Sequence, residues 1–311
     1  MQSGPSPLHV WLDGAVLPVS EARVPVTDRG FQLGDAVFET LRARRGVVIE
    51  LADHLARLRE STAALEIPLP DDPRDLGRGI AELLAVEGLD ADGSNGTEPA
   101  DAALRITVSR GPLTARGMLP TGWRDARPTI AIQAWPHVPP ATAVLERGLR
   151  AITSTVRHDP TSPLAGVKTT SRADHVYGRL EADRRDADEA IFLTVDGLVA
   201  EATSANVFVV AGDDLATPAR SSGILAGTTR GWLLGHAGAE GLRPVERDLR
   251  PDDLLGAGEA FLSSSVAGIV PLVSFDRRPI GTGRPGPRTM ALRAARERWI
   301  DERSQLDAVA R

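Results

Sequence analysis

The chain has 311 residues, of which 42% are hydrophobic and 25% charged, and these values are ordinary for a globular protein with room for about two domains. Its formal net charge of -6 and its low aromatic content of 4% argue against a nucleic-acid-binding surface, which needs clustered positive charge and stacking rings. The absence of cysteine excludes disulfides, thiolate metal sites and a cysteine nucleophile.

The N-terminal segment 1–18 lacks a basic start followed by an apolar run, so we expect no signal peptide. No stretch is long and apolar enough to predict a membrane-spanning helix. The six histidines are scattered without the spacing of metal ligands, so we expect no metal site. The simplest placement is cytoplasmic.

The first part of the chain predicts alternating strands and helices. Residues 8–12 and 16–19 are short apolar runs on either side of Asp13-Gly14, a turn pair typical of a hairpin. The other elements expected here are a strand at 47–49, a helix at 74–86, and strands at 104–108 and 129–134.

A first long helix is predicted over 53–67. Leu55, Leu58 and Leu65 recur there at helical spacing, and Asp53 is expected to be the N-cap.

The middle of the chain contains two stretches that break the pattern. Residues 90–101 are rich in Gly, Ser, Asn and Pro and predict a mobile insertion. The prolines of 136–140 suggest an interdomain linker. We therefore expect a small N-terminal domain at 1–135, a linker at 136–141 and a larger domain at 142–311.

The second part again alternates strands with helices, so the fold class is α+β, a mixture of helices and strands in two domains. Strands are expected at 149–155, 190–195, 207–210 and 259–262, and helices at 172–186, 228–237 and 289–302.

Lys168 is the only lysine of the chain, beside thirty-five arginines. Arginine can replace lysine in salt bridges and phosphate contacts, but its guanidinium stays protonated. A desolvated lysine amine can instead react with a carbonyl and form a Schiff base. The retained lysine therefore points to carbonyl chemistry, although a lysine left by chance is an alternative as long as its neighbours are ignored.

The sequence after Lys168 arranges several polar groups in order. A strand at 188–193 leads into the turn Asp196-Gly197, and the chain returns over 199–208. The glycine-marked loop at 223–230 opens a helix, where unpaired backbone N–H groups and the helix dipole favour an anion.

Together with His54–Leu58 and Asp28–Thr40 near the N-terminus, these motifs resemble the class IV aminotransferases, the fold-type IV pyridoxal-phosphate (PLP) enzymes. The resemblance runs from Trp11 to Pro287. It implies a small α/β domain, a larger domain built on a β-barrel-like sheet with flanking helices, and a homodimer with the active site at the subunit interface.

The resemblance also assigns roles around the cofactor ring. Lys168 matches the lysine that holds PLP as a Schiff base and later moves a proton. Glu201 matches the carboxylate that keeps the pyridine nitrogen protonated, so that the ring can accept electrons. Leu225 matches the apolar residue that packs on the ring.

Four further residues match the phosphate site of the family. Arg57 matches an arginine that contacts the phosphate. Thr228 and Thr229 match the pair at the helix start, and Ser265 matches the hydroxyl that completes the cup. Taken singly, each of these residues has an ordinary structural reading, such as a surface salt bridge or a helix start.

The substrate residues divide the family, and this chain fits no branch fully. D-amino-acid aminotransferases have a tyrosine where this chain has Phe38, and an Arg-x-His pair where it has Arg116 and Met118. Arg116 is thus kept for a substrate carboxylate, and the family analogy supplies it from the partner subunit. Branched-chain enzymes have a tyrosine five residues after the lysine, where this chain has Ala173.

Other features are similar to the aminodeoxychorismate lyases, which eliminate pyruvate. They are the run 163–168, Arg172, the pair Arg116-Gly117, and the run 264–271, whose Ser264 we count as a substrate-binding residue.

We favour a PLP-dependent transaminase that moves an amino group from a D-amino acid or (R)-amine to a 2-oxo acid. The lyase, which would give 4-aminobenzoate, is the alternative. A catalytically silent PLP-binding domain is a third possibility, but it predicts loss of Lys168 or Glu201, and the chain keeps both.

Residues 281–286 match GxGxxG, yet a proline interrupts them and no βαβ unit follows, so we expect no dinucleotide site.

Overall fold

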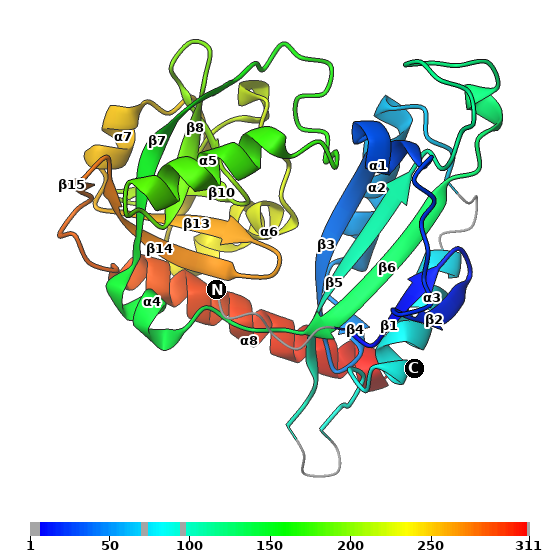
Figure 1. Cartoon of the computed structure of the whole chain (residues 1–311). Coiled ribbons are helices and arrows are strands. Elements are labelled where there is room, and N and C mark those ends of the chain that lie inside the picture. Colours follow the sequence, from blue (N-terminus) through cyan, green and yellow to red (C-terminus); the bar gives the residue numbers. More distant parts are fainter. Residues whose placement is uncertain (1–6, 70–73, 94–97, 310–311) are drawn as a thin grey trace. The chain divides into compact units, whose positions relative to one another are not determined.

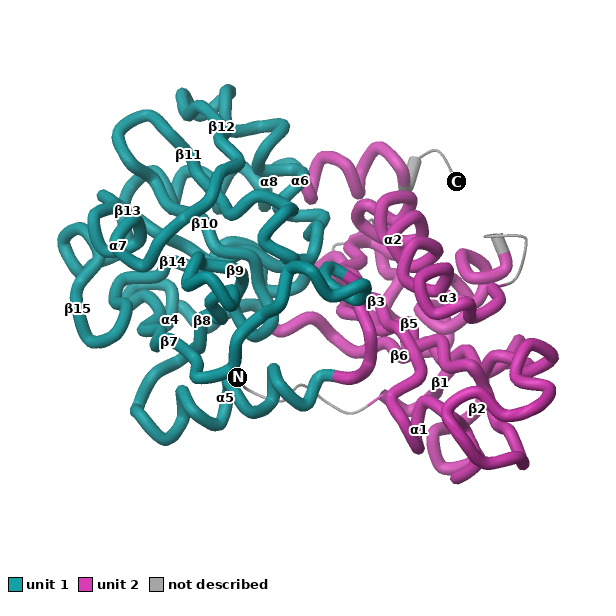
Figure 2. Tube along the Cα trace, turned by 90° about the horizontal axis from the view of Figure 1, so that it is seen from above, with its two compact units in different colours: residues 1, 139–166, 172–299 teal, residues 2–138, 167–171, 300–311 magenta. Residues whose placement is uncertain are grey.

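The computed structural model divides into two compact units, which Figure 2 shows in teal (unit 1) and magenta (unit 2). It describes residues 7–69, 74–93 and 98–309. Among these, unit 1 holds 139–166 and 172–299, and unit 2 holds the described residues up to 138 together with 167–171 and 300–309. Residues 94–97 of the expected insertion lie outside the described residues.

The units do not follow a single cut along the chain. The chain changes units between Val138 and Pro139, near the expected linker at 136–141, but the short stretch 167–171 belongs to unit 2. The last helix contributes residues to both units. The expected domain limits 1–135 and 142–311 stay a prediction, whereas the expected mixture of helices and strands is confirmed.

Unit 2 is built on a six-stranded sheet in the order β2-β1-β6-β5-β3-β4, in which all pairs are antiparallel. Its strands are β1 (His9–Leu12), β2 (Ala15–Pro18), β3 (Ala36–Arg44), β4 (Val47–Val48), β5 (Asp101–Ser109) and β6 (Thr129–Pro136). Its helices are α1 (Arg29–Leu33), α2 (Leu51–Ala64), α3 (Arg74–Val86) and the 3₁₀ turn η1 (Trp123–Asp125).

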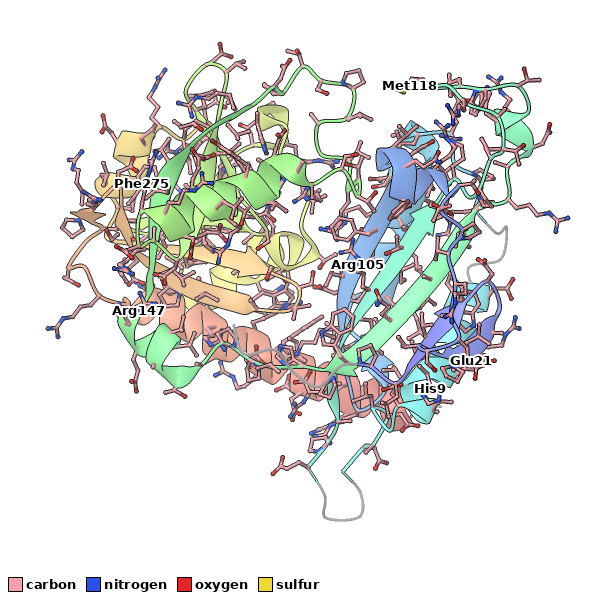
Figure 3. All side chains as sticks on the ribbon, in the orientation of Figure 1. His9, Glu21, Arg105, Met118, Arg147 and Phe275 are labelled. Carbon is pink, nitrogen blue, oxygen red and sulfur yellow. The ribbon has the colours of Figure 1, made fainter. Side chains whose placement is uncertain are left out.

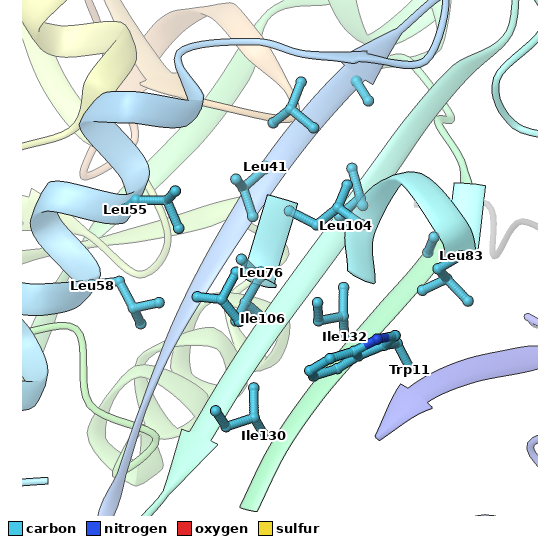
Figure 4. Close-up of a cluster of buried hydrophobic side chains, with 14 of the residues drawn as sticks. Trp11, Leu41, Leu55, Leu58, Leu76, Leu83, Leu104, Ile106, Ile130 and Ile132 are labelled. Atoms are coloured by element: carbon cyan, nitrogen blue, oxygen red, sulfur yellow. The ribbon is translucent and has the colours of Figure 1, made fainter. Parts of the chain in front are cut away.

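One face of this sheet packs against α2 and α3. Alternate strand residues point to the same face, so Leu41, Ile106 and Ile132 meet Leu58 and Leu83 of the two helices (Figure 4). All five side chains are buried to 1% exposure or less. The opposite face therefore remains for the polar and aromatic residues that alternate with this core.

The predicted hairpin and the helix at 74–86 are confirmed, but the expected N-cap of α2 is wrong. The helix begins at Leu51, two residues before Asp53, and its N-cap is Glu50. The link from β4 to α2 is only Ile49 and Glu50, so Glu50 takes a left-handed conformation with φ 55° to turn the chain. Asp53 instead lies in the first turn, where its carboxylate faces the positive helix end.

Unit 1 is built on a curled half-barrel sheet (Figure 1) with the strand order β12-β11-β10-β13-β14-β7-β8-β9, and β15 pairs with β14. Its strands are β7 (Leu149–His158), β8 (Glu189–Thr194), β9 (Val199–Ala202), β10 (Asn206–Ala211), β11 (Asp214–Thr217), β12 (Arg243–Glu246), β13 (Glu259–Ser264), β14 (Gly268–Phe275) and β15 (Arg278–Pro279).

Both faces of the central part of this sheet are covered, which explains the continuous buried runs of β8 and β10. Val209 and Leu262 face one cluster with Leu254 of α7, whereas Phe208 and Phe261 face another with Leu233 of α6. The helices are α4 (Thr142–Arg147), α5 (Ala173–Arg184), α6 (Thr228–His236), α7 (Pro251–Leu255) and α8 (Pro287–Val309), with 3₁₀ turns η2 (Arg220–Ser222) and η3 (Ala237–Glu240).

Within the described residues, no helix is long and apolar enough to cross a membrane. In the same residues, no group of three or more His, Cys, Asp or Glu side chains could hold a metal ion. The GxGxxG run 281–286 forms the loop between β15 and α8, where Gly281 packs so closely on the carbonyl of Gly258 that a side chain would collide.

Candidate active site

The backbone of Lys168 is fixed on the edge of the unit 2 sheet. The amide of Phe38 donates to the Lys168 carbonyl at 3.0 Å, and the amide of Thr170 donates to the Ala36 carbonyl at 2.8 Å. The Lys168 amide also donates to Ser61 Oγ of α2 at 3.3 Å. The lysine therefore has a short antiparallel pairing with β3, although no regular strand is assigned there.

The side chain of Lys168 lies over the ring of Phe38, with Nζ 4.7 Å from the ring centre. The guanidinium carbon of Arg105 lies 3.8 Å from the same centre. Arg105 belongs to β5, the strand next to β3 (Figure 3). Phe38 thus has two cations within cation–π distance, and the predicted lysine and Phe38 are brought together.

Arg105 is a functional candidate that the sequence interpretation missed. Its Nε donates to Thr107 Oγ1 at 3.2 Å, and among the described residues it has no carboxylate partner. Burial lowers the pKa of its guanidinium, because the low-dielectric surroundings disfavour the charge. A half-buried cation of this kind is ready to bind a carboxylate. The available signal was a charged residue within the predicted strand 104–108.

Arg57 lies on α2 and is buried against a carboxylate of the same unit. Its Nε donates to Glu39 Oε1 at 2.8 Å and its Nη2 to Glu39 Oε2 at 2.6 Å. His54 Nδ1 lies 2.7 Å from Glu39 Oε2. Burial would raise the pKa of the Glu39 carboxyl, but hydrogen bonds and charges from Arg57 and His54 outweigh it and lower the pKa to about 2.

Glu201 of β9 is a buried carboxylate of unit 1, with 7% exposure. Its Oε2 accepts a hydrogen bond from the Leu225 amide at 3.0 Å. The Leu225 carbonyl accepts from Asn206 Nδ2 at 2.8 Å. The structure therefore brings Glu201 and Leu225 together, while their roles at the cofactor ring stay predictions. Asn206, which holds the loop of Leu225, was not predicted as a site residue, although it lies in the returning run 199–208.

The start of α6 gathers hydroxyl groups around a helix N-terminus. The N-cap Gly227 has no side chain, and a Cβ there would collide with Asn206 Oδ1. Thr228 Oγ1 lies 3.2 Å from Ser265 Oγ. Thr229 is 1% exposed, and among the described residues its Oγ1 finds no hydrogen-bond partner. A buried hydroxyl left without a partner at an anion-favouring helix end needs an acceptor or donor from a ligand.

These groups fit the chemistry of PLP. The helix start with its hydroxyls suits a phosphate dianion, and Thr229 is the orphan that such a group would satisfy. The buried carboxylate of Glu201 suits a protonated ring nitrogen. The amine of Lys168 suits an aldehyde.

The expected substrate residues Ser264, Arg116 and Met118 belong to different elements of the fold. Ser264 ends β13, and its Oγ accepts from the Ala267 amide at 3.3 Å. Arg116 and Met118 lie in the exposed loop after β5, where Met118 is 76% exposed (Figure 3). Arg29 holds this loop through the carbonyls of Gly117 and Met118. Within unit 2, the side chain of Arg116 is exposed.

A family model described as amino-transferase class IV matches residues 36–275 of the chain. A Methanocaldococcus jannaschii protein provisionally named a branched-chain-amino-acid aminotransferase is 34% identical, over 96% of this chain and 97% of its own length. D-alanine aminotransferase of Bacillus licheniformis is 30% identical, over 94% and 97%. Aminodeoxychorismate lyase of Vibrio harveyi is 29% identical, over 84% and 89%.

Solved structures show the same relationship. The branched-chain aminotransferase of Thermoproteus uzoniensis with norvaline superposes with a TM-score of 0.83 and 28% identity, over 95% of each chain. The branched-chain amino acid aminotransferase of Thermobaculum terrenum in its PLP form superposes with a TM-score of 0.83 and 26% identity, over 96% of this chain and 95% of that chain. The second structure thus contains the cofactor expected here.

Proposed function

Because the chain belongs to the class IV aminotransferase family and is therefore PLP-dependent, we propose that it is a transaminase that moves an amino group from a D-amino acid or (R)-amine to a 2-oxo acid. The observation that carries the proposal is that the Lys168 amine and the half-buried guanidinium of Arg105 both lie over the ring of Phe38, and that Arg105 has no carboxylate partner among the described residues. An amine and a carboxylate anchor on the same sheet suit an amino-acid or oxo-acid substrate.

Lys168 would carry the covalent and proton-transfer work. When bound, PLP supplies an aldehyde that amines can attack and a ring that takes up electrons from the substrate α-carbon. Lys168 Nζ would hold the cofactor until the donor amine displaces it, and would then take the proton from the donor α-carbon. Its fixed backbone on β3 limits the positions that Nζ can reach.

Glu201 would hold a proton at the ring nitrogen. Its carboxylate is buried and already accepts the Leu225 amide, so one oxygen is oriented and the group stays in place. A charged carboxylate favours the protonated nitrogen beside it. Leu225 would lie against the ring.

The phosphate would be bound by Thr228, Thr229 and Ser265 around the start of α6, and by Arg57. The three hydroxyls and the helix N-terminus supply donors, and Arg57 supplies the charge.

The carboxylate of the 2-oxo acid would bind to Arg105, with Phe38 below it. Arg116, Met118 and Ser264 stay proposed substrate contacts, and Arg116 would come from a second copy of the chain. We accordingly propose a homodimer, and a cytoplasmic placement stays a prediction of the sequence.

Two other activities each have a specific observation in their favour. The M. jannaschii relative and the T. uzoniensis structure point to branched-chain amino acids. The V. harveyi relative points to pyruvate elimination from aminodeoxychorismate. All three reactions would use the same lysine. The two transaminations differ in the amino donor, whereas the lyase reaction uses the electrons released at the α-carbon to expel pyruvate.

A substrate panel separates the three. The holoenzyme is mixed separately with D-alanine, (R)-1-phenylethylamine, L-leucine and aminodeoxychorismate, and its visible spectrum is followed. Conversion to the pyridoxamine form by D-alanine or the (R)-amine supports the proposal, and conversion by L-leucine alone supports the branched-chain activity. Pyruvate release without pyridoxamine formation supports the lyase and rejects transamination.

A further inference from the structure

We propose that Glu39 and His54 are positioning residues that orient Arg57 toward the phosphate of the cofactor. The inference rests on the proposed role of Arg57. It adds two residues on the face of the sheet opposite to Phe38 and Lys168. The sequence motifs gave neither residue a role in binding the phosphate.

The contacts fix Arg57 in a plane. Its Nε and Nη2 both donate to the Glu39 carboxylate, at 2.8 and 2.6 Å, so the guanidinium cannot rotate without breaking two charge-assisted hydrogen bonds. Because a guanidinium is planar, fixing two of its nitrogens also fixes the direction of the third.

His54, which lies on α2 like Arg57, supports the carboxylate of Glu39. It lies one turn before Arg57, and its Nδ1 is 2.7 Å from Glu39 Oε2. Glu39 is 0% and His54 1% exposed, so water cannot replace either contact. The orientation of Arg57 is therefore held by the protein.

β3 links this cluster to the lysine. Phe38 and Glu39 are consecutive strand residues, so their side chains point to opposite faces of the sheet. Phe38 lies under Lys168 Nζ, and Glu39 binds Arg57 of α2. One rigid strand thus sets both the reactive amine and the proposed phosphate ligand.

The chain contains a matched control in the same sheet. Asp101 of β5 accepts from Arg42 Nε at 2.9 Å and from Arg42 Nη2 at 2.6 Å, and His137 Nδ1 lies 3.5 Å from Asp101 Oδ2. The Glu39 cluster has the same three kinds of group, and Asp101 in addition accepts from Arg44 Nη1 at 3.2 Å. No phosphate role is proposed for Arg42, so loss of Asp101 reports the structural cost alone.

The test compares binding of PLP and of pyridoxal, which lacks the phosphate, to apoprotein of the wild type, Glu39→Gln, Arg57→Gln and Asp101→Asn. We expect Glu39→Gln to weaken PLP binding roughly ten- to a hundredfold, the range found when residues that orient metal ligands are removed. Pyridoxal binding should stay within about twofold. Asp101→Asn should lower the unfolding free energy but leave both affinities near the wild-type values.

The outcomes separate the positioning role of Glu39 and His54 from the phosphate contact of Arg57. If Arg57→Gln weakens PLP binding and Glu39→Gln does not, or if Glu39→Gln weakens PLP and pyridoxal equally, the positioning role is rejected. If Arg57→Gln itself leaves PLP binding unchanged, the proposed phosphate contact of Arg57 fails instead. Should Glu39→Gln not fold, His54→Gln keeps the test open, since it removes one support and should lower the PLP-to-pyridoxal affinity ratio by a smaller factor.

Discussion

Lys168 differs from every arginine of the chain in having an amine that can lose its proton and attack a carbonyl. Lys168→Arg keeps a cation near Phe38 but removes this chemistry, and Lys168→Ala removes both. We expect the PLP-bound wild type to be yellow because the bound cofactor absorbs visible light. Both variants should lose this absorption and all measurable turnover. Absorption spectra after dialysis check this, and a cofactor band that persists in Lys168→Arg would contradict it.

Arg105 makes a second prediction for a single residue. Arg105→Gln should lower kcat/KM for 2-oxo acid acceptors about ten- to a hundredfold, since hydrogen bonds to charged groups contribute about 1.5–3 kcal/mol. The half-reaction with (R)-1-phenylethylamine, which has no carboxylate, should change little. Arg116→Gln, in the exposed loop, tests the other proposed carboxylate contact in parallel. An equal loss of Arg105→Gln on both substrates would reject a carboxylate role.

The start of α6 supports a prediction about a whole helix end. Thr229→Val removes a buried hydroxyl without a hydrogen-bond partner in the described part of the chain, so the apoprotein should not be destabilised. PLP binding should weaken about tenfold, because a hydrogen bond of about 1.4 kcal/mol would be lost. Thr217→Val is the control, since Thr217 Oγ1 donates to the Val207 carbonyl at 2.8 Å. It should cost stability without affecting PLP binding.

The contact between β3 and α2 predicts a dependence on pH. The pKa of Glu39 is lowered from 4.5 to about 2, so its pairing stabilises the folded state above about pH 4.5 and is lost as the pH falls toward 2. The shift corresponds to roughly 3 kcal/mol. Urea unfolding should therefore show wild type and Glu39→Gln converging in stability over this window. A constant difference would show that Glu39 titrates normally.

At the scale of the whole molecule, two exposed apolar side chains of unit 2 are candidates for a subunit interface. Phe31 of α1 is 75% and Met118 76% exposed, and Arg29 ties their two segments together through the carbonyls of Gly117 and Met118. If they form the interface of the proposed homodimer, Phe31→Glu should yield a monomer with little activity. Sedimentation measures this. Val195→Glu, at another exposed apolar residue, is the control and should stay dimeric.

Local signals were sufficient where an element needs only its own periodicity. Helix α3 has the predicted limits 74 and 86, and the hairpin forms around Asp13-Gly14. Strand β3 had no such signal, because Glu39, Arg42 and Arg44 interrupt its apolar pattern. These charges are tolerated only because Arg57, Asp101 and Asp301 pair with them from distant parts of the sequence.

The sequence by itself determined the family, the cofactor and the identity of the residues with the required chemistry, because a single amine, a carboxylate and a glycine-marked helix start are local properties. Only the tertiary structure decided which groups meet. The register of β3 against β5 brings Arg105 over Phe38, and the packing of α2 on the sheet places Arg57 on Glu39. Such contacts depend on strand pairing and helix packing between distant segments, which residue spacing along the chain does not encode.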